Sequence, residues 1–401
     1  MSEVAQPSVS RRAVFLVGGY ERNDAAGFFR RIGREMERFC KCWSVEAKLG
    51  APVEATGAVA TTAIADYLGP DGVCRSDITF LSFDDSVKRD GARPFLVRLG
   101  VYLVAFFDYV FSGTMFRFFS SNWRFALYFL YPFVMLAFFA WLGTIAYRLT
   151  GLLALPGGPV LPILVGASVA YAVGRFIGRR YFVFHLMDLW SFSREHLHCR
   201  RPEMDARIDD WASLIAERTA ATDYDEVLLI GHSTGGALIL DVAHQLAERR
   251  LVEGKNADFK LVTVGSTSLK VALHPKAKRA RERLEALARH HGIRWVEFQA
   301  LTDIINFYKC DPYARAGLTH QRSDVFPRQF QVRFRDMLER AAYKRVKKNF
   351  FRVHYQFISA NSRRYFYDFF MICCGTRPIE AIRNDRLPIA ADAGAMTETV
   401  S

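Results

Sequence analysis

The residue types most able to do chemistry lie in one short segment, 231–235, which reads Gly-His-Ser-Thr-Gly. It follows the apolar run Val227–Ile230 and precedes a helical pattern over Gly236–Arg249. A sharp turn between a strand and a helix lifts a serine hydroxyl out of the backbone. The flanking glycines let the strand and the helix approach without Cβ clashes. The segment therefore predicts that Ser233 is a nucleophile rather than part of a plain turn.

A serine hydroxyl needs a base, and the base needs an orienting carboxylate. In a doubly wound sheet such groups lie at the C-terminal ends of strands. His354 ends the apolar run Phe350–Val353, which we expect to be the last strand, and is the candidate base. Asp303 is the first carboxylate after the predicted strand Arg294–Gln299 and is the candidate acid. It is also placed to cap a helix that begins at Ile304.

Other residues offer weaker alternatives for these roles. Asp311 precedes Pro312 and is the alternative acid, although this pairing is typical of a turn. His320, in a polar loop, is the alternative base. His232 lies inside the sharp turn and is expected to point away from Ser233, so a structural role is predicted for it.

Short apolar runs and amphipathic segments alternate on both sides of a central apolar block. The predicted strands are 13–17, 43–49, 78–83, 227–230, 260–264, 294–299 and 350–353, and the predicted helices are 25–41, 204–219, 236–249 and 275–291. This alternation predicts an α/β fold, with a mostly parallel sheet and helices on both faces.

The central block is apolar enough to cross a membrane. Phe125–Tyr147 has no charged residue and matches a hydrocarbon core of about 30 Å. A second segment, about 155–174, carries Gly166 and Ala170, small residues that allow two helices to pack closely. We therefore expect an inserted transmembrane helical hairpin. Leu99–Phe119 is aromatic but carries charges, so we expect an amphipathic helix in the membrane interface.

The distribution of charge suggests a partner and an orientation. The net charge of +13 predicts an anionic surface as partner. Arg124 precedes the first span, Arg175, Arg179 and Arg180 follow the second, and the link holds only Arg148. The positive-inside rule then places both flanks in the cytoplasm, with anionic lipid favoured over nucleic acid. The seven cysteines without paired spacing and the lack of a secretory signal fit a multi-pass protein of the cell membrane with a cytoplasmic catalytic domain.

The order Ser233, Asp303, His354 matches that of α/β hydrolases, and the chain resembles this superfamily, in particular its serine esterases and lipases. The resemblance covers 12–83 and 204–355, and its one highly specific motif is Gly-His-Ser-Thr-Gly. It implies that Ser233 attacks an acyl carbon, that His354 transfers the proton and that Asp303 holds the imidazole tautomer.

The resemblance also implies an oxyanion hole, made by the N–H of Thr234 and an N–H of Gly19 or Tyr20. The loop Gly18-Gly19-Tyr20 departs from the family pattern, because the family often has a His-Gly pair there and this chain has no His. The insertion also departs from it, because it precedes the nucleophile strand and leaves after a strand that ends at Phe83. Chain leaving that end of a strand emerges on the active-site side, so we expect the hairpin near the catalytic mouth.

The expected domains follow from these features. They are 11–90 as the first part of an α/β-hydrolase domain, 91–190 as a membrane insertion with spans at about 125–147 and 155–174, 191–385 as the second part with the triad, and 386–401 as a disordered tail.

The predicted function is a membrane-anchored serine hydrolase that cleaves carboxylic esters, including lipid acyl esters, through an acyl-enzyme. The alternative is an inactive scaffold or binding protein of the same fold, since a fold does not determine a function. A thioester or amide substrate also stays open. No phosphate-binding glycine motif is present, and His196 and His198 have no further ligands nearby in sequence. The prediction therefore includes no cofactor and no metal.

Overall fold

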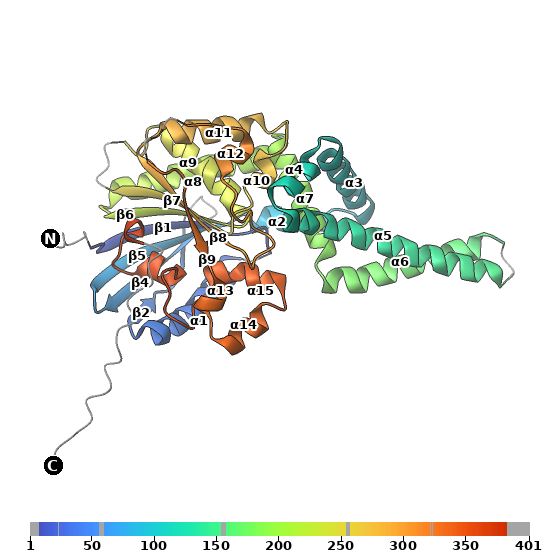
Figure 1. Cartoon of the computed structure of the whole chain (residues 1–401), viewed down its shortest axis with the longest axis horizontal. Coiled ribbons are helices and arrows are strands. Elements are labelled where there is room, and N and C mark those ends of the chain that lie inside the picture. The colour runs from blue at the N-terminus through green and yellow to red at the C-terminus, as the bar shows by residue number, and fades with distance from the viewer. Residues whose placement is uncertain are drawn as a thin grey trace, which may run out of the picture.

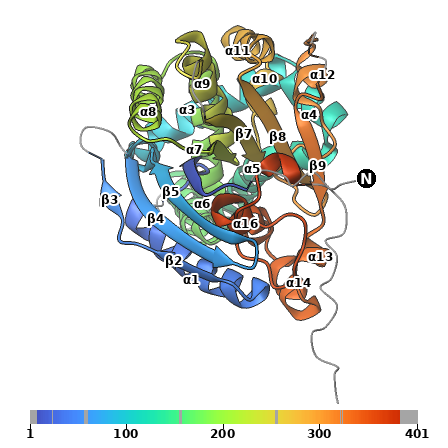
Figure 2. The ribbon, with the colours of Figure 1, turned by 90° about the vertical axis from the view of Figure 1, so that its left-hand side faces the viewer.

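The computed structural model of the protein describes residues 8–382 except 23, 56–59, 154–157, 254–256, 321 and 323. These residues form a nine-stranded sheet in the order β2-β4-β5-β1-β6-β7-β8-β9, with β3 paired to β4 (Figures 1 and 2). The strands are β1 Arg11–Val17, β2 Glu46–Leu49, β3 Val53–Glu54, β4 Ala60–Gly69, β5 Gly72–Leu81, β6 Glu226–His232, β7 Asp258–Val264, β8 Ile293–Ala300 and β9 Arg328–Val332.

Helices cover both faces of this sheet. They are α1 Ala25–Trp43, α2 Asp84–Ala92, α3 Phe95–Phe111, α4 Thr114–Ser121, α5 Trp123–Leu152, α6 Val160–Arg180, α7 Val183–Leu197, α8 Pro202–Ala221, α9 Gly235–Glu248, α10 Leu269–Ala272, α11 Lys278–Arg289, α12 Pro312–Ala316, α13 Phe334–Met337, α14 Arg340–Val346, α15 Phe350–Tyr355 and α16 Phe369–Cys374. In Figure 1, α8, α9 and α11 lie above the sheet and α1, α13 and α14 lie below it.

The strands from β5 through β1 to β9 run parallel. The inner strands β1, β6 and β7 are largely apolar because both of their faces are covered. Alternate side chains of β1 pack on opposite faces of the sheet. Phe15 and Val17 pack in a core that includes α7, α8 and α9. Val14 and Leu16 pack in a second core with α1 and α16. The predicted α/β class, with a mostly parallel sheet between two helical layers, is confirmed.

The predicted strand Phe350–Val353 is wrong, because these residues begin helix α15. Asn349 caps that helix, and its side chain accepts a hydrogen bond from the N–H of Arg352. The strand at that edge of the sheet is instead β9, which the prediction missed. Strand β4, antiparallel to β5, was missed as well.

The chain between β5 and β6 forms α2 to α7, and α5 and α6 extend from the rest of the protein as an antiparallel hairpin (Figure 1). Both are long and apolar enough to cross a membrane. Helix α5 has 30 residues, which span about 45 Å, and its first turns are buried in the globular part. A Cβ on Gly143 would lie 2.7 Å from the carbonyl oxygen of Gly166, so the two helices touch at their backbones.

Two membrane-related predictions differ in detail from the structure. The second helix occupies 160–180 rather than 155–174. The segment Leu99–Phe119 is two helices, α3 and α4, which are separated at Gly113, where φ is 77°. The predicted disordered tail, 386–401, lies outside the described residues.

An ion pair buried in the sheet offers a test of this architecture. Nε of Arg12 on β1 lies 2.8 Å from Oε2 of Glu226 on β6, and the two side chains are 0% and 2% exposed. Replacing Arg12 by Met would leave that carboxylate buried without its cation. We expect a loss of about 3–5 kcal/mol in the free energy of unfolding, measured by denaturant titration in detergent.

The control for this measurement is Arg249→Met, which removes a partly exposed ion pair with Asp209. An exposed pair of this kind contributes less than about 1 kcal/mol. Similar losses for the two variants would contradict a special contribution from the pair between β1 and β6.

Candidate active site

The turn that carries Ser233 is strained and closely packed. Ser233 has φ of 57°, in the left-handed region that residues other than glycine rarely adopt. A Cβ on Gly235 would lie 2.2 Å from the carbonyl oxygen of Val17. A Cβ on Gly231 would lie 2.6 Å from the carbonyl oxygen of Gly235. Both glycines are thus required by contact with backbone, and the serine between them is held at the C-terminal end of β6.

Asp303 and His354 are directly hydrogen-bonded. Oδ2 of Asp303 lies 2.7 Å from Nδ1 of His354, and the side chains are 0% and 5% exposed. The other carboxylate oxygen accepts the N–H of Ile305 at 2.9 Å, which fixes the carboxylate plane. A carboxylate can only accept here, so Nδ1 carries the hydrogen and Nε2 keeps a lone pair. Within the described residues, Nε2 is buried and has no hydrogen-bond partner.

One pocket of about 50 Å³ is lined by Ser233, His354, Gly19 and Tyr20. The Gly19 backbone is next to the serine, since a Cβ placed there would lie 3.5 Å from the Ser233 Oγ. The structure therefore brings together residues that are more than 300 positions apart in sequence. This volume has room for water or a small group, so a larger substrate requires the walls to move.

The backbone N–H groups proposed for the oxyanion hole are free. Among the described residues, no main-chain or side-chain acceptor is recorded for the N–H of Thr234, Gly19 or Tyr20. The side chain of Thr234 is buried beside the turn. Free N–H groups near a nucleophile are what an oxyanion hole requires.

Two buried histidines, His232 and His185, form part of the pocket wall. The His232 ring packs against His354 with centroids 4.6 Å apart and the rings tilted by 34°, and its Nε2 lies 3.2 Å from the His354 carbonyl oxygen. Burial lowers the pKa of His232 well below its usual value, so this ring is neutral and donates to that carbonyl. Burial likewise lowers the pKa of His185 to about 4. His232 thus contacts His354 and lines the same pocket as Ser233, and a structural role for it stays a prediction.

Sequence reasoning missed Glu21, which lines the same pocket. Burial raises its pKa to about 7, against the opposing effect of Arg31. The signal was its position directly after Tyr20, in the loop that follows β1. A titratable carboxyl group here can exchange a proton or a hydrogen bond with a substrate near neutral pH.

The alternative acid and base lie elsewhere. Asp311 caps α12, where its side chain accepts the N–H of Ala314 at 2.8 Å. The ring of His320 packs against Tyr313 with centroids 5.1 Å apart. Neither residue lines the pocket that holds Ser233.

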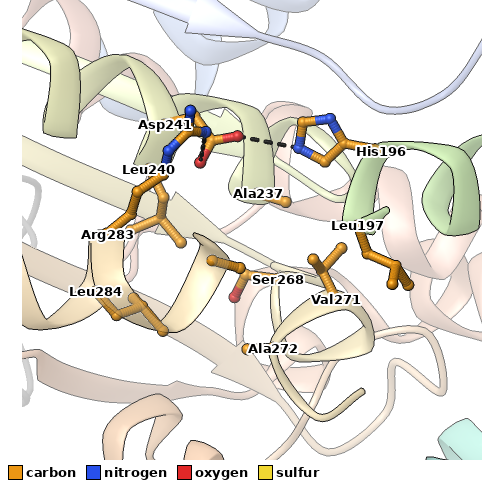
Figure 3. Close-up of a pocket in the computed structure, with 11 residues that line it drawn as sticks. His196, Leu197, Ala237, Leu240, Asp241, Ser268, Val271, Ala272, Arg283 and Leu284 are labelled. Carbon is orange, nitrogen blue, oxygen red and sulfur yellow. Dashed lines mark hydrogen bonds and ion pairs between the residues drawn. The ribbon is translucent and has the colours of Figure 1, made fainter. Parts of the chain in front are cut away.

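His196 and His198 bind different carboxylates rather than one site. His196 Nε2 lies 3.0 Å from Asp241, whose other oxygen pairs with Arg283 (Figure 3). His198 Nε2 lies 2.6 Å from Asp108. Each histidine therefore belongs to a separate buried polar cluster.

The ligand atoms of Asp108, His198 and His274 lie within 4.8 Å of one another. However, Arg194 also donates to Asp108, at 2.7 Å. The N–H of Lys276 donates to Nδ1 of His274, which puts the ring hydrogen on the Nε2 that faces Asp108. A protonated nitrogen cannot ligate a metal, and the guanidinium repels one. The cluster is a hydrogen-bond network that ties α3 to α7.

The sheet, the sharp turn at its centre and the Asp–His pair define a hydrolase-type fold and site. In comparison with known families, residues 152–392, more than half of the chain, match the alpha/beta hydrolase family, and the chain belongs to it. Comparisons with curated proteins and with solved structures found no match. The expected resemblance to this superfamily is confirmed, and membership supports a hydrolase activity.

Proposed function

We propose that the protein is a membrane-anchored serine hydrolase that cleaves carboxylic esters through an acyl-enzyme. The observation that carries this proposal is the His354 ring. Its Nδ1 is held by the buried Asp303, and its Nε2 is unpartnered in the pocket that Ser233 lines. An imidazole held in this way can accept a proton from a serine hydroxyl.

The reaction proceeds in two halves. Ser233 Oγ attacks the acyl carbon while His354 Nε2 takes its proton, and His354 then gives that proton to the leaving alkoxide. In the second half, water attacks the acyl-enzyme with the same proton transfers through His354, which releases the acid and regenerates the serine. The negative oxygen of each tetrahedral intermediate accepts hydrogen bonds from the N–H of Thr234 and from that of Gly19 or Tyr20, each worth about 3 kcal/mol in related sites. Asp303 keeps the imidazole in the required tautomer.

The membrane insertion forms part of the pocket and supports a lipid ester as substrate. Tyr128 of α5 and His185, Leu186 and Leu189 of α7 line the pocket together with Ser233 and His354. The helices beside the hairpin also expose large apolar side chains: Leu96, Leu103, Val104, Phe107, Phe111, Phe116 and Phe119. Such a surface is suited to the bilayer interface. A lipid can then enter from the bilayer without crossing water.

The proposed orientation follows from charge. Arg175, Arg179 and Arg180 are exposed at the end of α6 nearest the globular part. We propose that they lie at the anionic cytoplasmic surface, which places the catalytic domain in the cytoplasm.

An active-site probe tests the proposal directly. We expect a fluorophosphonate to label the full-length protein in detergent, with the adduct mapped to Ser233 by mass spectrometry. Ser233→Ala should abolish labelling, because the probe reacts only with an activated hydroxyl. The control is Ser213→Ala on α8, whose hydroxyl bonds the Asp209 carbonyl and should leave labelling unchanged. An unlabelled wild-type protein would favour the inactive scaffold.

A further inference from the structure

A buried lysine contacts the turn next to the proposed nucleophile. Lys270 lies on α10 and is 1% exposed. Its Nζ donates to the Thr234 Oγ1 at 2.9 Å. An ammonium group has three donors, and lysine is almost never fully buried unless it is paired with a carboxylate. Among the described residues, no ion pair with Lys270 is found within 4.0 Å.

A second buried lysine, on a strand of the sheet, shows the ordinary arrangement. Lys260 on β7 is 0% exposed, but its Nζ lies 2.6 Å from Asp258 and 2.7 Å from Glu380. The two lysines are both removed from water, yet among the residues that the structure describes carboxylates compensate the charge of Lys260 and not that of Lys270. Within the described part of the chain, the side chain that Lys270 contacts through a hydrogen bond is a hydroxyl at the proposed oxyanion hole.

Three carboxylates in this part of the protein already have basic partners. Asp241 on α9 binds His196 and Arg283, and Asp108 on α3 binds Arg194 and His198, with His274 beside it. Asp303 binds His354. Burial alone, with no opposing charge, lowers the pKa of Lys270 to about 7.

We propose that Lys270 is a positioning residue that acts through Thr234 to hold the oxyanion-binding N–H in place and to add positive potential behind it. This role rests on the proposed hydrolase function. The hydrogen bond to Oγ1 restrains the residue whose N–H binds the negative oxygen of the tetrahedral intermediate. A charge in a water-excluded site acts more strongly than it would in water. The effect therefore appears in the transition state rather than in substrate binding.

The sign of the pH dependence follows from the chemistry of an amine. Lys270 carries its charge below its pKa and loses it as the pH rises. The wild-type kcat should therefore fall on the alkaline side, near pH 7 to 8.

The test measures kcat and KM against pH for a short soluble ester, with the full-length protein in detergent. Lys270→Met keeps the side-chain length and removes the charge. We expect kcat at pH 6.5 to fall by roughly ten- to a hundredfold with KM nearly unchanged. The alkaline decline should also disappear, which a purely structural role would not cause. Lys260→Met is the matched control and should keep the wild-type pH profile.

A second variant keeps the proposal testable if Lys270→Met does not fold. Thr234→Val keeps the backbone N–H and removes the hydroxyl that Lys270 contacts, so it should also weaken the alkaline decline. An unchanged kcat in Lys270→Met, or an intact alkaline decline in both variants, would overturn the role of Lys270. A wild-type protein without Ser233-dependent activity would instead reject the proposed function itself.

Discussion

Asp303→Asn is expected to lower kcat for ester hydrolysis by about 10⁴-fold, the loss known for this substitution in a Ser-His-Asp enzyme. The reason lies in the two contacts of the carboxylate. One oxygen accepts the N–H of Ile305 and the other binds His354 Nδ1. In the Asn variant, the amide oxygen would satisfy Ile305 and the NH₂ group would face Nδ1. The imidazole hydrogen would then move to Nε2, which could no longer accept the serine proton.

The measurement is kcat for a short ester, together with thermal unfolding to show that the fold is retained. The matched control is Asp311→Asn, because an asparagine caps the start of α12 about as well as an aspartate. Its kcat should stay within about twofold of wild type. A large loss in Asp311→Asn with little loss in Asp303→Asn would reject the assignment of the acid.

Replacing three exposed apolar residues on α5 by Arg is expected to prevent the protein from staying in the membrane. Val134, Phe138 and Trp141 are 61%, 40% and 56% exposed and project from one side of the hairpin. Each Arg near the centre of a spanning helix costs about 2.5–3.5 kcal/mol. We therefore expect alkaline carbonate to extract the triple Arg variant and to leave the wild-type protein in the membrane pellet.

The control replaces the same three residues by Leu and should stay in the membrane. The triple Arg variant should keep fluorophosphonate labelling of Ser233, because the substituted positions lie outside the catalytic pocket. It should lose most activity on esters embedded in vesicles. If vesicle activity persisted after extraction, the entry of substrate from the bilayer would be rejected, while the triad proposal would stand.

His354 illustrates how far local patterns reach. The residue was chosen because it follows an apolar run, and the structure does place it against Asp303. The strand predicted for this run is wrong, because a four-residue run with three apolar side chains does not distinguish a strand from a helix. The Asn349 cap decides in favour of the helix. Strands β4 and β9 were missed because Ala, Thr, Arg and Gln dominate them, and pairing with neighbouring strands stabilises them.

The sequence by itself determined the sharp turn at Ser233, the buried parallel strands around it and the apolar hairpin. These features depend on short-range requirements: glycines where backbones touch, apolar runs where both faces are covered, and uncharged length where lipid is the solvent. Only the tertiary structure decided that Glu21 lines the pocket and that Lys270 reaches Thr234. Such contacts join segments that are distant in the chain, so no local pattern encodes them, and burial then sets the protonation of the groups involved.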